Sequence, residues 1–180
     1  GVYSFSALRS FQILSFGPSG KNPGLSGRSG VCCANANFMV ATQGQYSPGN
    51  NFSFFWDPNS GQQDATFLPI GAMNDAGDIA GGINDWAYIR YRNGASDAIG
   101  TMGPGTIASD VNNNRVVIGY SRTQGGGPQK SFVWNLTQGM REVRFVDNKR
   151  RIWPALPGLG LTAINDSNVV VMSRHHNHFI

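Results

Sequence analysis

The sequence predicts an all-β fold, specifically a four-bladed β-propeller of four-stranded antiparallel blades, from three observations. A nine-residue hairpin motif occurs four times, charged residues make up only 13% of the chain, and 24 of the 180 residues are Gly. Few charges and many glycines are typical of short strands joined by turns. The length suits a single domain, and we assign residues 1–180 to one propeller domain.

The repeated motif is an apolar residue, a turn rich in Asn, Asp and Gly, and then an apolar run. Asx side chains satisfy nearby backbone groups and Asn tolerates positive φ, so each copy predicts a tight hairpin between two strands. We interpret these Asn and Asp residues as structural, with calcium or sugar ligands as the alternative. Cys33 aligns with Met73 in this reading, and Ala34 then replaces the Asn of the first copy. The copies, which begin 40, 38 and 53 residues apart, are 33–41, 73–81, 111–119 and 164–172.

An aromatic, alternating segment follows each of the first three hairpins and predicts a third strand at 53–56, 87–91 and 131–134. A turn then leads to a short fourth strand, which we place at 65–68 in the first unit and at 142–146 in the third. Four strands in a unit of about 40 residues are typical of a propeller blade.

The two ends of the chain are expected to share one blade. The fourth unit has its hairpin and then His178-Phe179-Ile180, which matches the aromatic third strand, and it stops one strand short. Residues 2–8 form an alternating segment that no hairpin precedes. We therefore predict that the N-terminal strand completes the last blade and closes the ring, because closure removes exposed strand edges. The start at Gly1 fits both a processed mature chain and a trimmed one.

These motifs resemble those of the HAF-repeat family of predicted extracellular proteins. The family hairpin, Ile-Asn-Asp/Asn-x-Gly-x-Val-x-Gly, is matched by residues 73–81 and 111–119, and more loosely by 164–172. The His-Ala-Phe-x-Trp segment of the family is matched by 53–56, 131–134 and 178–180. The resemblance implies a secreted or surface β-propeller, and hence an extracellular location. It implies no activity, because such repeats determine a fold and not a chemistry.

The charge and hydropathy of the chain limit its possible partners, and its two cysteines have two possible roles. The net charge of +4 is too mild to indicate a nucleic-acid partner. No segment reaches the roughly 18 uncharged apolar residues that a membrane-spanning helix needs. The adjacent Cys32 and Cys33 face opposite sides of a strand, and we expect Cys33 to be a small buried apolar side chain. A redox or metal-binding pair is the alternative.

The candidate ligand-binding residues lie mostly in the extra length of the third unit, at residues 141–154. This stretch is rich in basic residues, and a segment that departs from the repeat length on a regular scaffold is a common place for a binding site. Aromatic rings stack on sugar rings, and polar side chains bind hydroxyl and anionic groups. We expect a non-catalytic, lectin-like module for carbohydrate or another extracellular ligand, neutral or anionic, with a homo-oligomer left open. A solvated crossover loop is the alternative. The expected ligand-binding residues are Arg144, Arg150, Arg151, Trp153 and Trp86, and Trp56 and Trp134 on the predicted third strands add aromatic surface.

All three histidines of the chain lie close together, at His175, His176 and His178. On a strand His176 and His178 share a face and can reach one divalent metal ion. The sequence contains no Gly-x-Ser-x-Gly, Walker or His-Glu-x-x-His pattern, so we assign no catalytic residue. The second hypothesis is a metal-dependent hydrolase or oxidase that uses these histidines, and a divalent metal is its only implied cofactor. A structural or solvent-exposed role for them is the other interpretation.

Overall fold

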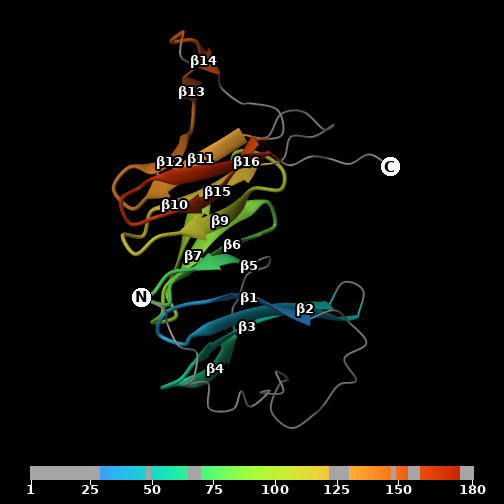
Figure 1. Ribbon diagram of the computed structural model, residues 1–180. Helices are drawn as coiled ribbons and strands as arrows, with labels where there is room; N and C mark the ends of the chain where they lie inside the picture. Colours follow the sequence, from blue (N-terminus) through green and yellow to red (C-terminus); the bar gives the residue numbers. More distant parts are fainter. Residues whose placement is uncertain are drawn as a thin grey trace.

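The computed structural model describes residues 29–47, 50–64, 70–121, 130–146, 149–153 and 159–174. Within these ranges the backbone forms five separate antiparallel sheets, three of four strands and two of two strands (Figure 1). The first sheet consists of β1 (Ser29–Ala34), β2 (Val40–Ser47), β3 (Asn50–Asp57) and β4 (Gly61–Asp64). The second consists of β5 (Ile70–Met73), β6 (Ile79–Ile83), β7 (Trp86–Arg90) and β8 (Ser96–Gly100). The third consists of β9 (Ile107–Val111), β10 (Val117–Ser121), β11 (Lys130–Asn135) and β12 (Gly139–Glu142). The two small sheets are β13 (Phe145–Val146) with β14 (Ile152–Trp153), and β15 (Leu159–Ile164) with β16 (Val170–Arg174).

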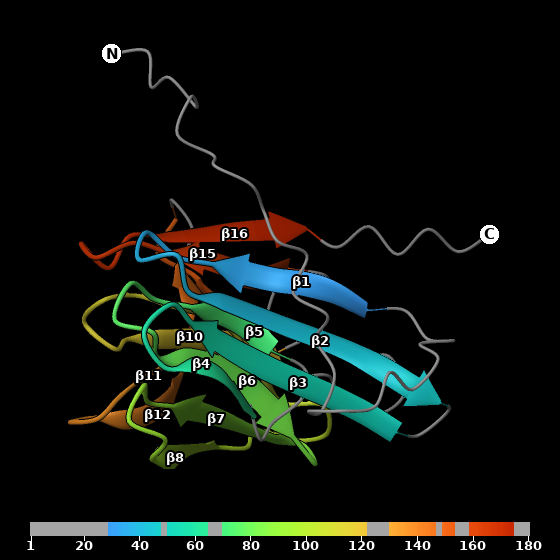
Figure 2. The same ribbon diagram turned by 90° about the horizontal axis from the view of Figure 1, so that it is seen from below.

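The three four-stranded sheets and the β15–β16 hairpin follow one another in a row, with an apolar core in each gap (Figures 1 and 2). Fully buried Met39, Phe55 and Ile79 fill the gap between the first and second sheets. Ile89 and Phe132 belong to the core between the second and third sheets. Ile118, Leu161 and Ile164 close the last gap. The apolar residues of each hairpin are therefore buried between consecutive sheets, which is how four small units become one stack.

The predicted hairpins are confirmed, and their turns gather along one side of the stack (Figure 2). In each turn an Asn side chain accepts hydrogen bonds from backbone N–H groups two or four residues later, as in Asn112 Oδ1 with the N–H groups of Asn114 (3.1 Å) and Val116 (2.9 Å). This is the local Asx chemistry that the motif predicts. The turn residues are therefore structural, as expected.

The same Asn side chains also link each hairpin to the next one. Asn35 Nδ2 donates to the Asn74 carbonyl (2.9 Å), and Asn74 Nδ2 donates to the Asn112 carbonyl (3.1 Å). Asn112 Nδ2 then donates to the Asn165 carbonyl at 2.9 Å. We call this series the asparagine ladder. It has one direction, because every hairpin donates to the hairpin that follows it in sequence.

A second series of contacts starts from a β-bulge that recurs in the first strand of each hairpin. The bulged residues are Cys32, Gly71, Ser109 and Thr162, each two positions before the last residue of its strand. Ser109 Oγ donates to the Leu161 carbonyl of the next hairpin at 2.7 Å, and Cys32 Sγ donates to the Ile70 carbonyl at 3.3 Å. In the first and third sheets the bulge thus turns a side chain toward the backbone of the next unit.

The ladder corrects the alignment of the first hairpin by one residue. Asn35, and not Ala34, is the counterpart of Asn74, and Ala34 pairs with Val40 as Met73 pairs with Ile79. Cys33 is therefore not in the core position of Met73, and it is only half-buried. Cys32 and Cys33 are free thiols, and contact with the Cys32 thiol together with burial raises the pKa of Cys33.

The fourth turn position of every hairpin has a left-handed backbone. Its φ is +59° at Phe38, +85° at Gly77, +60° at Arg115 and +61° at Asn168. Only Gly and, to a lesser degree, Asn adopt this conformation at little cost. Phe38 is the most unfavourable of the four, because its ring is 77% exposed and gains nothing from burial within the chain.

We expect Phe38→Asn to raise the free energy of unfolding by about 1 kcal/mol, because Asn tolerates the left-handed conformation better than an aromatic residue. Phe38→Ala is the matched control, since it removes the same ring and keeps the strain. Urea denaturation compares the three proteins. Equal stability of the Asn and Ala variants would mean that the strain at Phe38 is negligible.

The prediction of a closed four-bladed propeller is wrong. The three four-stranded units are present, but the described residues form separate sheets in an open row, and the fourth unit has only β15 and β16. The extra length of the third unit forms a sheet of its own, β13–β14, and not part of a blade. The N-terminal strand and residues 178–180, on which closure depended, lie outside the described residues.

The third strands at 53–56, 87–91 and 131–134 are confirmed by β3, β7 and β11. The fourth strands begin earlier than predicted, immediately after each turn. In the first unit β4 occupies Gly61–Asp64, while 65–68 lies outside the described residues. In the third unit β12 ends at Glu142, and the chain then continues into β13. The described part of the chain contains no helix long and apolar enough to cross a membrane.

Candidate functional site

An open groove of about 710 Å³ lies on the turn side of the stack, where the first three sheets meet. Four separate turns contribute to it: the β3–β4 turn, the β5–β6 hairpin, the β7–β8 turn and the β9–β10 hairpin. All but one of its lining residues are polar or charged, and they are Asp57, Asn59, Ser60, Ala76, Asp78, Tyr91, Arg92, Asn93 and Arg115.

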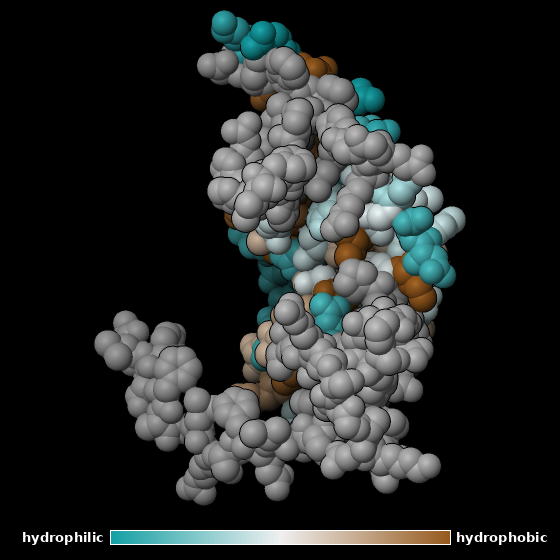
Figure 3. Space-filling view, turned by 90° about the vertical axis from the view of Figure 1, so that its right-hand side faces the viewer, coloured by the Kyte–Doolittle hydropathy of each residue, from teal (hydrophilic) through white to brown (hydrophobic). Residues whose placement is uncertain are grey.

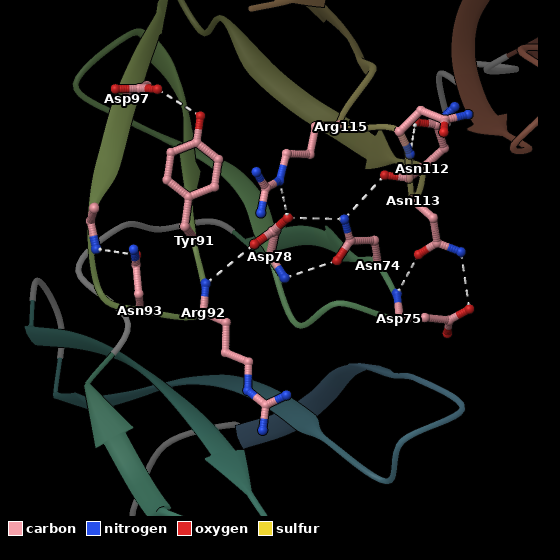
Figure 4. A network of polar contacts seen from close by, with 12 residues as sticks. Asn74, Asp75, Asp78, Tyr91, Arg92, Asn93, Asp97, Asn112, Asn113 and Arg115 are labelled. Carbon is pink, nitrogen blue, oxygen red and sulfur yellow. Dashed lines mark hydrogen bonds and ion pairs between the residues drawn. The ribbon is translucent and has the colours of Figure 1, made fainter.

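Asp78 is the centre of the polar network in this groove (Figure 4). Its side chain is 1% exposed, and Oδ2 accepts from Arg115 Nε (2.7 Å) and Asn74 Nδ2 (3.2 Å). Its other oxygen accepts from the backbone N–H of Arg92 at 3.2 Å. These three hydrogen-bond donors offset the free-energy cost of burying the carboxylate. Asp78 therefore joins the β5–β6 hairpin to the β7–β8 turn and to the next hairpin.

Arg115 is held from two directions. Besides its bond to Asp78, the guanidinium lies over the ring of Tyr91, with Cζ 4.9 Å from the ring centroid. The hydrogen bond to Asp78 raises the pKa of Arg115 further above its usual value. The side chain is still 54% exposed and lines the groove, so the guanidinium is both accessible and held in place by Asp78 and Tyr91. A guanidinium that is fixed in advance loses little conformational entropy when it binds a ligand.

A second ion pair forms the opposite side of the groove. Arg92 Nη2 lies 2.7 Å from Asp57 Oδ2, which links the second sheet to the first. Asp57 Oδ1 accepts the backbone N–H of Asn59 at 2.8 Å. That backbone bond and the nearby guanidinium lower the pKa of Asp57. The Asp57–Arg92 and Asp78–Arg115 pairs thus repeat one arrangement: a buried carboxylate and a half-exposed guanidinium.

Tyr91 donates its hydroxyl proton to Asp97 Oδ2 at 2.6 Å. Burial, together with this hydrogen bond and the charge of Asp97, raises the pKa of Tyr91 to about 12. The folded protein therefore holds the neutral phenol more strongly than the unfolded chain does. This contribution to stability is complete below the ordinary Tyr pKa of about 10 and is lost as the pH rises toward 12.

We expect wild type to lose stability relative to Tyr91→Phe between pH 10 and about pH 12, since only wild type must keep this phenol protonated. Urea denaturation at pH 8, 10 and 11 measures the difference, and the phenolate absorbance of wild type minus variant gives the pKa itself. Phe keeps the ring beneath Arg115, so the difference between the two proteins reports the contribution of the hydroxyl group alone. Ionisation of Tyr91 near pH 10 would contradict the hydrogen bond to Asp97.

The ligand-binding residues predicted from the sequence do not form one site. The β13–β14 hairpin projects from the third sheet, away from the groove (Figure 1). Arg144, Arg150 and Arg151 are exposed there, and Figure 3 shows hydrophilic groups at the outer end of this projection with hydrophobic atoms beside them. Trp86 belongs to the second sheet and is 44% exposed. Trp153 is in β14, and the position of its side chain is not among the described features.

Two other tryptophans that suggested sugar stacking are built into the sheets. Trp134 is 5% exposed in the core between the second and third sheets, so it offers no ring face to a ligand. Trp56 is half-buried on β3. The aromatic third strands therefore serve packing, which is the usual role of alternating aromatic residues in strands.

The metal hypothesis stays a prediction. His175, His176 and His178 lie outside the described residues. Within the described ranges, no group of three or more His, Cys, Asp or Glu side chains is arranged to hold a metal ion.

No protein-family model matches the chain, and no curated protein or solved structure shows significant similarity to it. The resemblance to HAF repeats rests on the short motifs alone. The function must therefore be argued from the groove.

Sequence reasoning missed the groove because its residues come from four turns, and only two of these turns belong to the repeated hairpin motif. One signal was available. Asp78 follows the turn Asn by four residues, a position that Met39 and Val116 fill with apolar side chains in other hairpins. A carboxylate at an apolar position, with Arg115 in the next turn, indicates a buried ion pair between neighbouring hairpins.

Proposed function

We propose that this chain is a non-catalytic, extracellular carbohydrate-binding module, and that the groove between Asp57 and Arg115 is its sugar site. The observation that carries the proposal is the pair of guanidinium groups fixed by buried carboxylates, Arg92 by Asp57 and Arg115 by Asp78. Each presents oriented N–H donors at an open polar surface. Sugar hydroxyls need such donors, and they also need nearby acceptors.

The size and composition of the groove support this class of ligand. Small-molecule sites commonly occupy about 300–1,000 Å³, and this groove occupies about 710 Å³. Exposed Asn59 and Asn93 add amide groups that both donate and accept. The lining contains two carboxylates and two guanidinium groups, so their formal charges cancel. That balance favours a neutral, hydroxyl-rich ligand over a strongly anionic one.

A glycan array followed by calorimetry tests the proposal. We expect the wild-type chain to bind at least one glycan, and Arg92→Gln and Arg115→Lys to weaken binding by about tenfold or more, as the loss of charged hydrogen bonds predicts. Arg115→Lys keeps a cation beside Asp78, so the fold is preserved. Arg144→Gln is the control. Arg144 is an exposed residue between β12 and β13, outside the groove, so this variant should bind glycan as wild type does.

Two outcomes would contradict the proposal. An array without a hit would remove the carbohydrate function. Glycan binding that survives Arg92→Gln and Arg115→Lys but fails with Arg150→Ser and Arg151→Ser would move the site to the β13–β14 hairpin.

A further inference from the structure

The contacts between consecutive hairpins follow one rule that extends beyond the asparagine ladder. In the first two of the three steps, the left-handed residue of the next hairpin covers the residue four positions after the ladder Asn. Met39 is 1% exposed, and its sulfur lies against Gly77 so closely that a Cβ there would come within 2.6 Å of it. Asp78 is likewise 1% exposed, and it is paired with Arg115. These two steps thus match their residues in size or in charge, and at the third step the left-handed Asn168 accepts from Asn112 Nδ2 through its Oδ1 at 2.9 Å.

The rule leaves one residue without its counterpart at each end of the row. At the last hairpin, Val169 takes the position of Met39 and Asp78, yet it is 60% exposed. At the first hairpin, Phe38 takes the position of Gly77 and Arg115, and it is 77% exposed. Both residues are apolar. Val169 has the position of the covered residue in this type of contact, and Phe38 has the position of the residue that covers it. Among the described residues these are the ends of the stack, and they complement one another.

The hydrogen bonds are complementary in the same way. The Asn74, Asn112 and Asn165 carbonyls each accept two bonds, one within the hairpin and one from the preceding ladder Asn. Within the described part of the chain, the Asn35 carbonyl accepts only the bond from Phe38 N. Asn165 Nδ2 is the donor that would make the next step, and it has no acceptor among the described residues.

We propose that the chain associates with itself head to tail, with the β15–β16 hairpin of one copy stacked on the β1–β2 hairpin of the next. In this contact Phe38 of the second copy covers Val169 of the first, and Asn165 Nδ2 of the first donates to the Asn35 carbonyl of the second. Exposed Val171 on β16 extends the apolar surface of the same end. The interface is heterologous, so it builds rings or filaments, whereas a two-fold symmetric dimer needs the same surface on both copies. The contact also accounts for a strained, exposed Phe at a turn position that favours Gly or Asn.

Sedimentation analysis over a range of concentrations tests this. Phe38→Asp removes the ring and places a charge opposite Val169, at a left-handed position that Asp tolerates better than an aromatic residue does. Val169→Asp places at the last hairpin the residue that Asp78 provides at the second. Both substitutions therefore suit their backbone sites. Asn165→Asp is a second variant of the last hairpin, because it keeps the Oδ1 acceptor for the N–H groups of Ser167 and Val169 and removes only the donor.

We expect wild type to form species larger than one chain as concentration rises, and each variant to raise the dissociation constant about tenfold or more, as for truncation of a central contact. A mixture of Phe38→Asp with Val169→Asp should form dimers and nothing larger, since one intact end remains on each chain. Ile152→Ser, which removes an equally exposed apolar side chain from β14, should associate as wild type does.

Three results would overturn the proposal. The first is wild type that stays a single chain at all concentrations. The second is self-association that Phe38→Asp and Val169→Asp leave unchanged. The third is a mixture of these two variants that forms no dimer, because a symmetric interface cannot be rescued in this way.

Discussion

Replacing Gly71 with Ala is expected to cost at least about 3 kcal/mol of folding free energy, at the upper end for overpacking, or to prevent folding. Gly71 is the bulged residue of the second sheet, and a Cβ there would overlap the carbonyl oxygen of Ala108 and lie 3.1 Å from Ser109 Cα. Both obstacles are backbone atoms of the third sheet, so neither can move aside cheaply. The second and third sheets would have to separate across the largest core of the stack.

Thr162→Ala is the matched control for Gly71→Ala. Thr162 has the same bulge position in β15, but its hydroxyl bonds only to the Val171 carbonyl of its own hairpin, at 3.1 Å. We expect this change to cost about 1 kcal/mol or less, the usual value for one hydrogen bond. Thermal or urea denaturation of both variants measures the difference. Similar costs at the two positions would show that the sheets are not in close contact at Gly71.

The second large effect is expected for Asp78→Ala, at about 3 kcal/mol of stability. The change removes the common acceptor of Arg115 Nε, Asn74 Nδ2 and the Arg92 N–H, and charged hydrogen bonds are each worth about 1.5–3 kcal/mol before the remaining groups readjust. Arg115 would also lose its orientation in the groove. Asp78→Ala should therefore lower both the melting temperature and the affinity for glycan.

Asp75→Ala is the control, because Asp75 is an exposed carboxylate one turn position after Asn74. Its Oδ1 accepts one backbone bond, from Ala36 N at 3.2 Å, and its Oδ2 accepts one side-chain bond, from Asn113 Nδ2 at 3.1 Å, and both bonds are exposed. A loss of stability as large as that of Asp78→Ala would mean that burial of the Asp78 network is not what stabilises the turn side of the stack.

The parts of the fold that depend on local chemistry could be predicted from the sequence. Asn112 satisfies backbone groups two and four residues away, so the hairpin is encoded within one short segment. The ladder could not be predicted, since the acceptor of Asn112 Nδ2 is 53 residues away. The alignment error at Cys33 has a related cause. The small residues Cys33 and Ala34 before the turn hide the register, and only the contact with the next hairpin identifies Asn35 as the ladder residue.

The closed ring failed for a different reason. The prediction rested on counting strands: the fourth unit lacked one strand, and the N-terminus offered one extra strand. Such a count cannot distinguish a closed ring from an open row. The geometry of the row is set by bulged residues such as Gly71 and Ser109, whose contacts with the next sheet have no counterpart in the repeat pattern. The groove was missed in a similar way, because Asp57 and Arg92 come from different sheets.

The most direct test of the central claim is a glycan titration followed by two-dimensional NMR of the wild-type chain. The groove predicts shifts of the backbone amides of Asn59, Arg92 and Asn93 and of the Arg115 side-chain Nε–H, all of which line it. The amides of Val146 and Ile152 in the projecting hairpin should not change. Shifts confined to residues 141–153, or the absence of shifts with every glycan tried, would contradict the account.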